Sequence, residues 1–127
     1  MADNLTDVAE NRGLDWLTGN SPAAPVLPLK VALVTANGSD SAPGTEVSGG
    51  SYARLNVAFA AASGGATSNL ADLVWTGMPA ATVVGIEIWD SAGTPVRWWW
   101  GPLTASKTLA SGDEFKLAAG DIDLTLG

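Results

Sequence analysis

The sequence contains no cysteine and no histidine among its 127 residues. Without these side chains it has no disulfide framework, no Ser-His-Asp or Cys-His nucleophile, and no histidine or thiolate metal site. A phosphate-binding loop is also missing, because Gly49-Gly50 precedes an expected strand rather than a helix and no GK[ST] sequence is present. We therefore predict a protein that is not an enzyme, with no catalytic residues, no metal and no cofactor.

Basic residues are scarce as well. Lysine and arginine number 6 against 13 aspartates and glutamates, which gives a formal net charge of −7 at pH 7. Binding to nucleic acid needs clustered positive charge, so we expect no nucleic-acid partner. No apolar run approaches the roughly 18 residues of a membrane span, and the N-terminus lacks the basic start and apolar segment of a signal peptide. The sequence predicts a soluble, unsecreted protein without a membrane partner.

The rest of the composition is that of a folded domain. Hydrophobic residues make up 46% of the chain and charged residues only 15%, and there are 15 glycines. The apolar content suffices for a core, while the low charge predicts a surface of small, weakly polar groups. Such a surface suits a subunit that neighbours cover.

The N-terminal segment, residues 1–19, is expected to form a helix capped by Asn4 or Thr6. Leu14 and Leu17 lie off its main apolar stripe, so the helix has more apolar surface than one contact would cover. It could pack on the protein's own sheet, which is the first interpretation, or dock on another subunit. The main stripe consists of Leu5, Val8, Ala9 and Trp16.

The remainder of the chain divides into a strap and a β-domain. Residues 20–28 hold three prolines, Pro22, Pro25 and Pro28, and are expected to be extended. Residues 29–127 show short strand patterns separated by Asn-Gly, Gly-Gly and Gly-Asp turn signals. Short strands separated by such turns predict a mainly β fold, an antiparallel β-sandwich or jelly-roll-like domain with one short N-terminal helix. The expected strands cover 29–35, 51–59, 69–76, the hairpin 82–103, and three closing segments at 107–110, 114–118 and 122–126.

The hairpin at 82–103 carries four of the six tryptophans. Period-two alternation places Ile86, Ile88, Val96, Trp98 and Trp100 on the core face. The second face then holds Glu87, Trp89, Arg97 and Trp99. Indoles at Trp89 and Trp99 suggest either a surface that a neighbour covers or a two-sided core with one or two half-exposed rings.

Strand spacing also predicts the domain core. Its members are Val31, Leu33, Leu55, Val57, Phe59, Ile86, Ile88, Trp98 and Phe115.

A recurrence near the C-terminus favours turns over a metal site. Leu109–Asp113 is echoed eight residues later by Leu117–Asp121, and each ends in Gly-Asp. Together with Asp123 these aspartates could bind calcium, but their spacing matches no compact oxygen-ligand loop. We interpret each Gly-Asp pair as a turn.

Two further functions are formally open. Glu87 with Asp90, or Asp113 with Glu114, could serve as glycosidase carboxylates, but these acids flank turns in a domain with little material for a cleft. The run Trp98–Trp100 could stack on a sugar, although consecutive strand residues point to opposite faces.

Several segments together resemble a known family. They are AENRGLDWLTG (9–19), EVSGGSYAR (46–54), MPAATV (78–83), IWD (88–90), GPLT (101–104) and the closing Gly-Asp pairs. In this order, over nearly the whole chain, they resemble small virion proteins of tailed phages of actinobacteria, which are commonly described as tail-fibre-like or minor structural proteins. The resemblance implies a non-enzymatic subunit of the phage particle, made in the host cytoplasm.

Within that class the sequence favours an accessory decoration or minor capsid protein bound to the head lattice, because a chain this short lacks heptads and fibre repeats. The alternative is a tail-associated, tail-fibre-like or baseplate protein that binds host-surface carbohydrate. Expected partners are other virion proteins, first the major capsid protein, and further copies of the chain in a trimer, since head lattices repeat gaps at local threefold positions. The candidate interface residues are Leu5, Val8, Leu14, Trp16, Leu17, Pro22, Pro25, Pro28, Trp89 and Trp99.

Overall fold

The computed structural model describes residues 4–126. Residues 1–3 of the predicted 1–19 helix, and residue 127, lie outside the described range. No helix within that range is long and apolar enough to cross a membrane. The elements, in chain order, are β1 (Asn4–Leu5), α1 (Asp7–Leu17), β2 (Leu29–Ala36), β3 (Thr45–Glu46), β4 (Leu55–Val57), β5 (Ala66–Ser68), β6 (Leu73–Trp75), β7 (Ala81–Trp89), β8 (Arg97–Leu109), β9 (Phe115–Leu117) and β10 (Asp123–Thr125).

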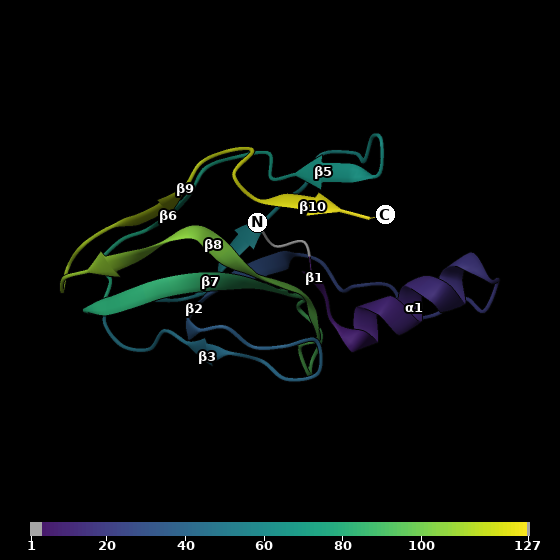
Figure 1. Ribbon diagram of the computed structural model, residues 1–127, viewed down its shortest axis with the longest axis horizontal. Coiled ribbons are helices and arrows are strands. Elements are labelled where there is room, and N and C mark those ends of the chain that lie inside the picture. The colour runs from purple at the N-terminus through teal and green to yellow at the C-terminus, as the bar shows by residue number, and fades with distance from the viewer. Residues whose placement is uncertain (1–3, 127) are drawn as a thin grey trace.

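The strands form an antiparallel sandwich, which confirms the predicted fold class. The larger sheet has the order β1-β8-β7-β2-β3, and β4 also pairs with β2. Two small sheets, β6-β9 and β5-β10, lie over it, while α1 extends from one end of the molecule (Figure 1). Because the helix leaves the body at this end, its sides are open to other contacts.

The core lies between the large sheet and the two small ones. Val31, Leu33, Ile86 and Ile88 have no exposed surface, and Phe115 is 3% exposed. The other predicted core residues are buried or pack against this cluster, except that Trp98 is buried outside it. The alternation of apolar residues along the strands therefore identified the core.

The hairpin of β7 and β8 has a register that differs from the predicted one. Ile88 pairs with Trp99, whereas the next residue, Trp89, pairs with Arg97, so Trp98 is an extra residue in β8. A bulge of this kind inverts the alternation beyond it. Trp99 packs against the core cluster and Trp100 pairs with Glu87 on the other face, which is the reverse of the prediction.

The N-terminus also differs in detail. Thr6 caps α1, and its hydroxyl accepts a hydrogen bond from the Ala9 N–H at 3.2 Å. Leu5 belongs to β1, opposite Trp99, and not to the helical stripe. Two-residue strands such as β1 and β3 carry no periodic pattern, so the sequence did not indicate them.

The C-terminal turns are as predicted. The carboxylates of Asp113 and Asp121 each accept the backbone N–H three residues earlier, at 2.8 Å. Gly112 and Gly120 have φ of +88° and +84°, a conformation that glycine adopts without strain. Buried Asn69 then fixes the last strand, because its side chain accepts from the Ile122 N–H at 2.9 Å.

Candidate functional site

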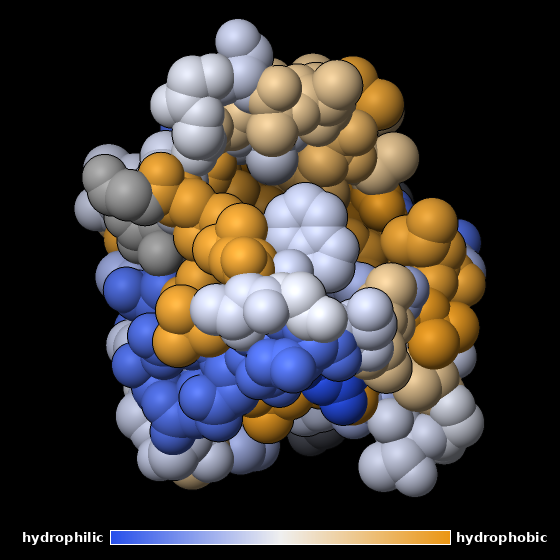
Figure 2. Space-filling view, turned by 90° about the vertical axis from the view of Figure 1, so that its right-hand side faces the viewer, coloured by the Kyte–Doolittle hydropathy of each residue, from blue (hydrophilic) through white to orange (hydrophobic). Residues whose placement is uncertain are grey.

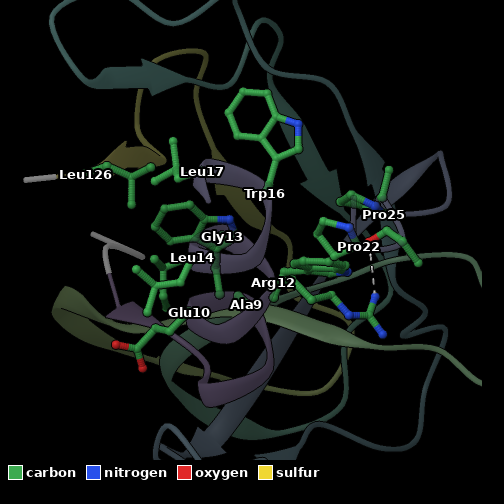
Figure 3. Close-up of a pocket in the computed structure, with 15 residues that line it drawn as sticks. Ala9, Glu10, Arg12, Gly13, Leu14, Trp16, Leu17, Pro22, Pro25 and Leu126 are labelled. Atoms are coloured by element: carbon green, nitrogen blue, oxygen red, sulfur yellow. Dashed lines mark hydrogen bonds between the residues drawn. The ribbon is translucent and has the colours of Figure 1, made fainter. Parts of the chain in front are cut away.

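An apolar groove of about 640 Å³ lies at the end of the molecule that carries α1 (Figure 3). Hydrophobic surface spreads over this end (Figure 2). The groove is formed by α1, the strap at residues 20–28, the start of β8 and the C-terminal end. Its lining residues are Leu5, Ala9, Glu10, Arg12, Gly13, Leu14, Trp16, Leu17, Pro22, Ala23, Ala24, Pro25, Trp98, Trp99 and Leu126.

Only the beginning of α1 is attached to the sheet. The Thr6 hydroxyl donates to the Arg97 carbonyl at 2.8 Å, and Ala9 is the one buried residue of the helix. Asp7 and Glu10 lie in the first turn, where negative charge offsets the partial positive charge of the helix N-terminus. The sequence thus places a stable helix start against β8.

The second half of α1 is exposed. Leu14, Trp16 and Leu17 are 62%, 70% and 73% exposed, and Val8 is 44% exposed. The first interpretation of the helix, packing of its stripe on the protein's own sheet, is therefore wrong beyond Ala9. Three large apolar side chains remain beside the groove without cover from the described residues.

Arg12 connects the helix to the body and to the strap. Its guanidinium lies 5.1 Å from the centre of the Trp98 ring, in cation–π geometry. The same group donates to the Ala23 carbonyl at 3.5 Å. Arg12 therefore holds one wall of the groove against the other.

The strap is fixed at its C-terminal half by the hairpin turn. The Asp90 carboxylate accepts from the Val26 N–H at 3.3 Å and from Trp98 Nε1 at 3.2 Å. Ser91 donates its hydroxyl to the Pro28 carbonyl at 2.6 Å. Burial opposes the charge on Asp90, but hydrogen bonds from Val96, Trp98, Ala92 and Val26 outweigh it and lower its pKa. The extended strap is thus ordered by its own chain.

Most of the predicted interface residues lie together at the groove. The seven that line it are Leu5, Leu14, Trp16, Leu17, Pro22, Pro25 and Trp99. The other three do not line it. Pro28 borders a second apolar cavity of about 610 Å³ with Leu27 and Phe59. Val8 is exposed elsewhere on α1, and Trp89 lies under the Arg54 guanidinium, 4.4 Å from its ring centre.

Sequence reasoning missed several lining residues. Leu126 reaches the groove because β10 returns beside β5, which no local pattern shows. Arg12 is an ordinary exposed helix cation by sequence. Gly13 is visible in the sequence only as a glycine that weakens a helical pattern, by roughly 1 kcal/mol relative to alanine.

The second face of the hairpin is covered by a loop of the same chain, which corrects its interpretation as a surface that a neighbour covers. The buried Glu87 carboxylate accepts from the Gly44 N–H at 2.7 Å, and Trp100 Nε1 donates to Asp40 at 2.8 Å. A side chain at Gly85 would collide with Asn37. The loop from Asn37 to Gly44 therefore covers this face, as in the two-sided-core interpretation.

A polar cluster beside Trp89 is also satisfied internally. Tyr52 donates to Glu46 at 2.6 Å, and Arg54 binds both Glu46 carboxylate oxygens at 2.9 and 3.0 Å. Partial burial opposes the charge on Glu46, yet these hydrogen bonds lower its pKa, whereas burial and the bond to Glu46 raise the pKa of Tyr52. Within residues 4–126 these groups stabilise the β2–β3–β4 region.

Three acidic side chains lie close enough together that their carboxylate oxygens could share a cation. Carboxylates of Asp7, Glu10 and Asp40 lie within 4.8 Å of one another and are exposed. The helix N-terminus and the Trp100 indole account for their positions.

A family model described as Gp80, Podophage GP4 fiber I protein gp80, matches residues 4–125. The matched range includes α1, the strap and all the strands described above. No curated protein matches the chain.

Proposed function

We propose, since the chain belongs to the Gp80 family of podophage fibre proteins, that it is a subunit of a phage fibre and attaches to its neighbours through the groove beside α1. Membership makes the chain a bacteriophage structural protein and a component of the virion. The finer role is carried by one observation: the largest exposed apolar side chains of α1 gather at one groove, whereas within residues 4–126 every buried polar side-chain atom has a hydrogen-bond partner.

A structural role without catalysis fits the groove's chemistry. Its walls are almost entirely apolar, with Glu10 and Arg12 as the charged exceptions. The buried acids that sequence reasoning considered for a glycosidase, Glu87 and Asp90, are occupied by hydrogen bonds within the fold. Exposed apolar surface gathered in this way is typical of protein–protein interaction sites.

The family description favours the fibre over the capsid decoration that the sequence indicated first. The compact, non-repetitive domain keeps attachment to the head lattice as the second candidate. The actinobacterial host, synthesis in the host cytoplasm and the trimer are predictions that the family description does not address. A role in binding host carbohydrate has less support, because Trp98 is buried and Trp100 is bonded to Asp40.

Localisation in the particle tests the proposal. An epitope inserted at exposed Gly93, where an added Cβ would meet nothing within 4 Å, labels the subunit at a turn that does not line the groove. We expect the label on fibres. Label on the head surface would favour the decoration role, and purified particles that lack the chain would overturn both.

Groove variants test the attachment. In a phage that lacks the native gene, we expect the double variant Trp16→Ser, Leu17→Ser to fold but to be missing from particles. Val74→Ser, which removes a 39% exposed apolar side chain from β6, is the matched control and should be incorporated. Normal incorporation of the double variant would exclude the groove as the attachment surface.

A further inference from the structure

Gly13 lies in the middle of α1, where the fold of a single chain gives no reason for glycine. A Cβ atom built at this position would meet nothing within 4 Å, and its φ is not positive. A glycine inside a helix is less favourable than alanine because it loses more backbone freedom on folding. The same position would accept alanine with a gain in helix stability, so no contact within the described chain requires glycine here.

The surroundings of Gly13 indicate what that reason is. Ala9, one turn earlier, is buried by the chain's own fold, whereas Gly13 is exposed and has the exposed side chains of Leu14, Trp16 and Leu17 around it (Figure 3). An exposed glycine lets a second backbone approach closely, while large apolar neighbours supply the contact area. Gly13 is thus the low point of an exposed apolar helix face.

We propose that this face binds the α1 helix of a second copy of the chain, with the two helices antiparallel and crossing at Gly13. The inference deepens the proposed function and rests on it, since a fibre brings many copies together. About a twofold axis, residues equally far from Gly13 meet. The exposed Glu10 carboxylate then faces the indole N–H of Trp16 of the second copy.

The available area matches a second copy. Leu14, Trp16, Leu17 and Leu126 are 62%, 70%, 73% and 62% exposed. With roughly 200 Å² for a tryptophan and about 100 Å² for a leucine, they offer roughly 350 Å² of apolar surface per copy before the strap is counted. An average interface of about 800 Å² per partner is somewhat more than half apolar, or about 450 Å². Contact between two such faces, with the strap included, therefore reaches the size of a stable dimer.

The cysteine-free sequence allows a direct test. A disulfide needs Cα atoms about 4.4–6.8 Å apart, so Gly13→Cys cross-links two copies only where the helices touch at this residue. Asn11→Cys, on an exposed part of α1 that does not line the groove, is the matched control. Under mild oxidation of the full chain, at a concentration where even a dimer weakened by the added side chain is populated, we expect Gly13→Cys to form dimers at least tenfold faster than Asn11→Cys. Equal rates would overturn the proposal.

Gly13→Ala separates association from folding. We expect it to raise Tm by about 3–6 °C in dilute solution, as a helix glycine replaced by alanine should. The added methyl should at the same time weaken the dimer at least tenfold in sedimentation equilibrium. Asn11→Ala should leave association unchanged. Unaltered association in Gly13→Ala, or a wild-type chain that sediments as a monomer or a trimer, would overturn the twofold contact.

These results are independent of the role in the particle. A chain found on fibres that nevertheless sediments as a monomer would retain the proposed function and remove the second copy from the groove. A chain that forms the dimer but is missing from particles would retain the contact between copies and overturn the proposed function.

Discussion

The Glu87 carboxylate and the Arg97 guanidinium lie 3.1 Å apart on the paired strands β7 and β8, with side chains only 3% and 7% exposed. Arg97 also donates to the Ser39 carbonyl, and Glu87 accepts from Gly44 and from Trp89 Nε1. The pair therefore holds the covering loop onto the hairpin, as well as linking two strands. Removing one charge leaves the other buried without its partner.

We expect Arg97→Met to lower the free energy of unfolding by about 3–5 kcal/mol, the usual loss when one member of a buried ion pair is removed. Urea unfolding measures this change in the free energy of unfolding. Lys116→Met is the control, because Lys116 and Asp72 form a pair at 3.4 Å whose side chains are 52% and 51% exposed. Exposed pairs contribute little, so the control should keep its midpoint. Equal midpoints in the two variants would show that the Glu87–Arg97 pair has no structural role.

Acid should weaken the attachment of the strap. Hydrogen bonds hold the pKa of Asp90 below its ordinary value of 3.8, so its charged form stabilises the folded state above that value. That contribution is lost as the pH falls below about 4. Asp90→Asn should lower stability at pH 7 by about 1–3 kcal/mol and flatten the dependence between pH 5 and pH 2. Urea midpoints across this range that fall equally in both proteins would contradict this assignment.

Ile88 in the core and Trp98 at the groove should respond differently to replacement by alanine. Ile88→Ala should cost about 2–5 kcal/mol and Trp98→Ala about 3–5 kcal/mol, a large part of a total of about 5–15 kcal/mol. Trp98 also supports Arg12, so Trp98→Ala should speed tryptic cleavage after Arg12, whereas Ile88→Ala should do so only as far as it unfolds the chain. Unchanged urea midpoints for both would show that they are surface residues.

The sequence predicted those features that depend on local periodicity. Alternation from Leu29 to Ala36 and along β7 identified buried strands, and Thr6 was one of two proposed helix caps. The bulge at Trp98 could not be predicted, because the apolar run Trp98–Trp100 fits either register, and the one-residue shift reverses the faces beyond it. The burial of Glu87 depended on a distant loop and gave no local signal.

The candidate site was predicted in the same uneven way. Leu14 and Leu17 were recognised as apolar residues that the main stripe does not use, and both line the groove. The opposite wall depends on tertiary contacts: Arg12 meets Trp98, and Leu126 arrives through the pairing of β10 with β5. Residues brought together over such sequence distances require the fold itself.

Trp16 should report on the occupation of the groove. It is 70% exposed, whereas Trp75 and Trp98 are 2% and 8% exposed and the other three indoles are half-buried. Acrylamide is uncharged, so the net charge of −7 should not bias its access to the rings. In dilute solution Trp16→Phe should remove most of the readily quenched fluorescence, and Trp99→Phe should remove little. As the wild-type concentration rises through the association range, the same fraction should become protected from quenching. A quenched fraction that stays constant while the chain associates would place the contact on another face of the molecule.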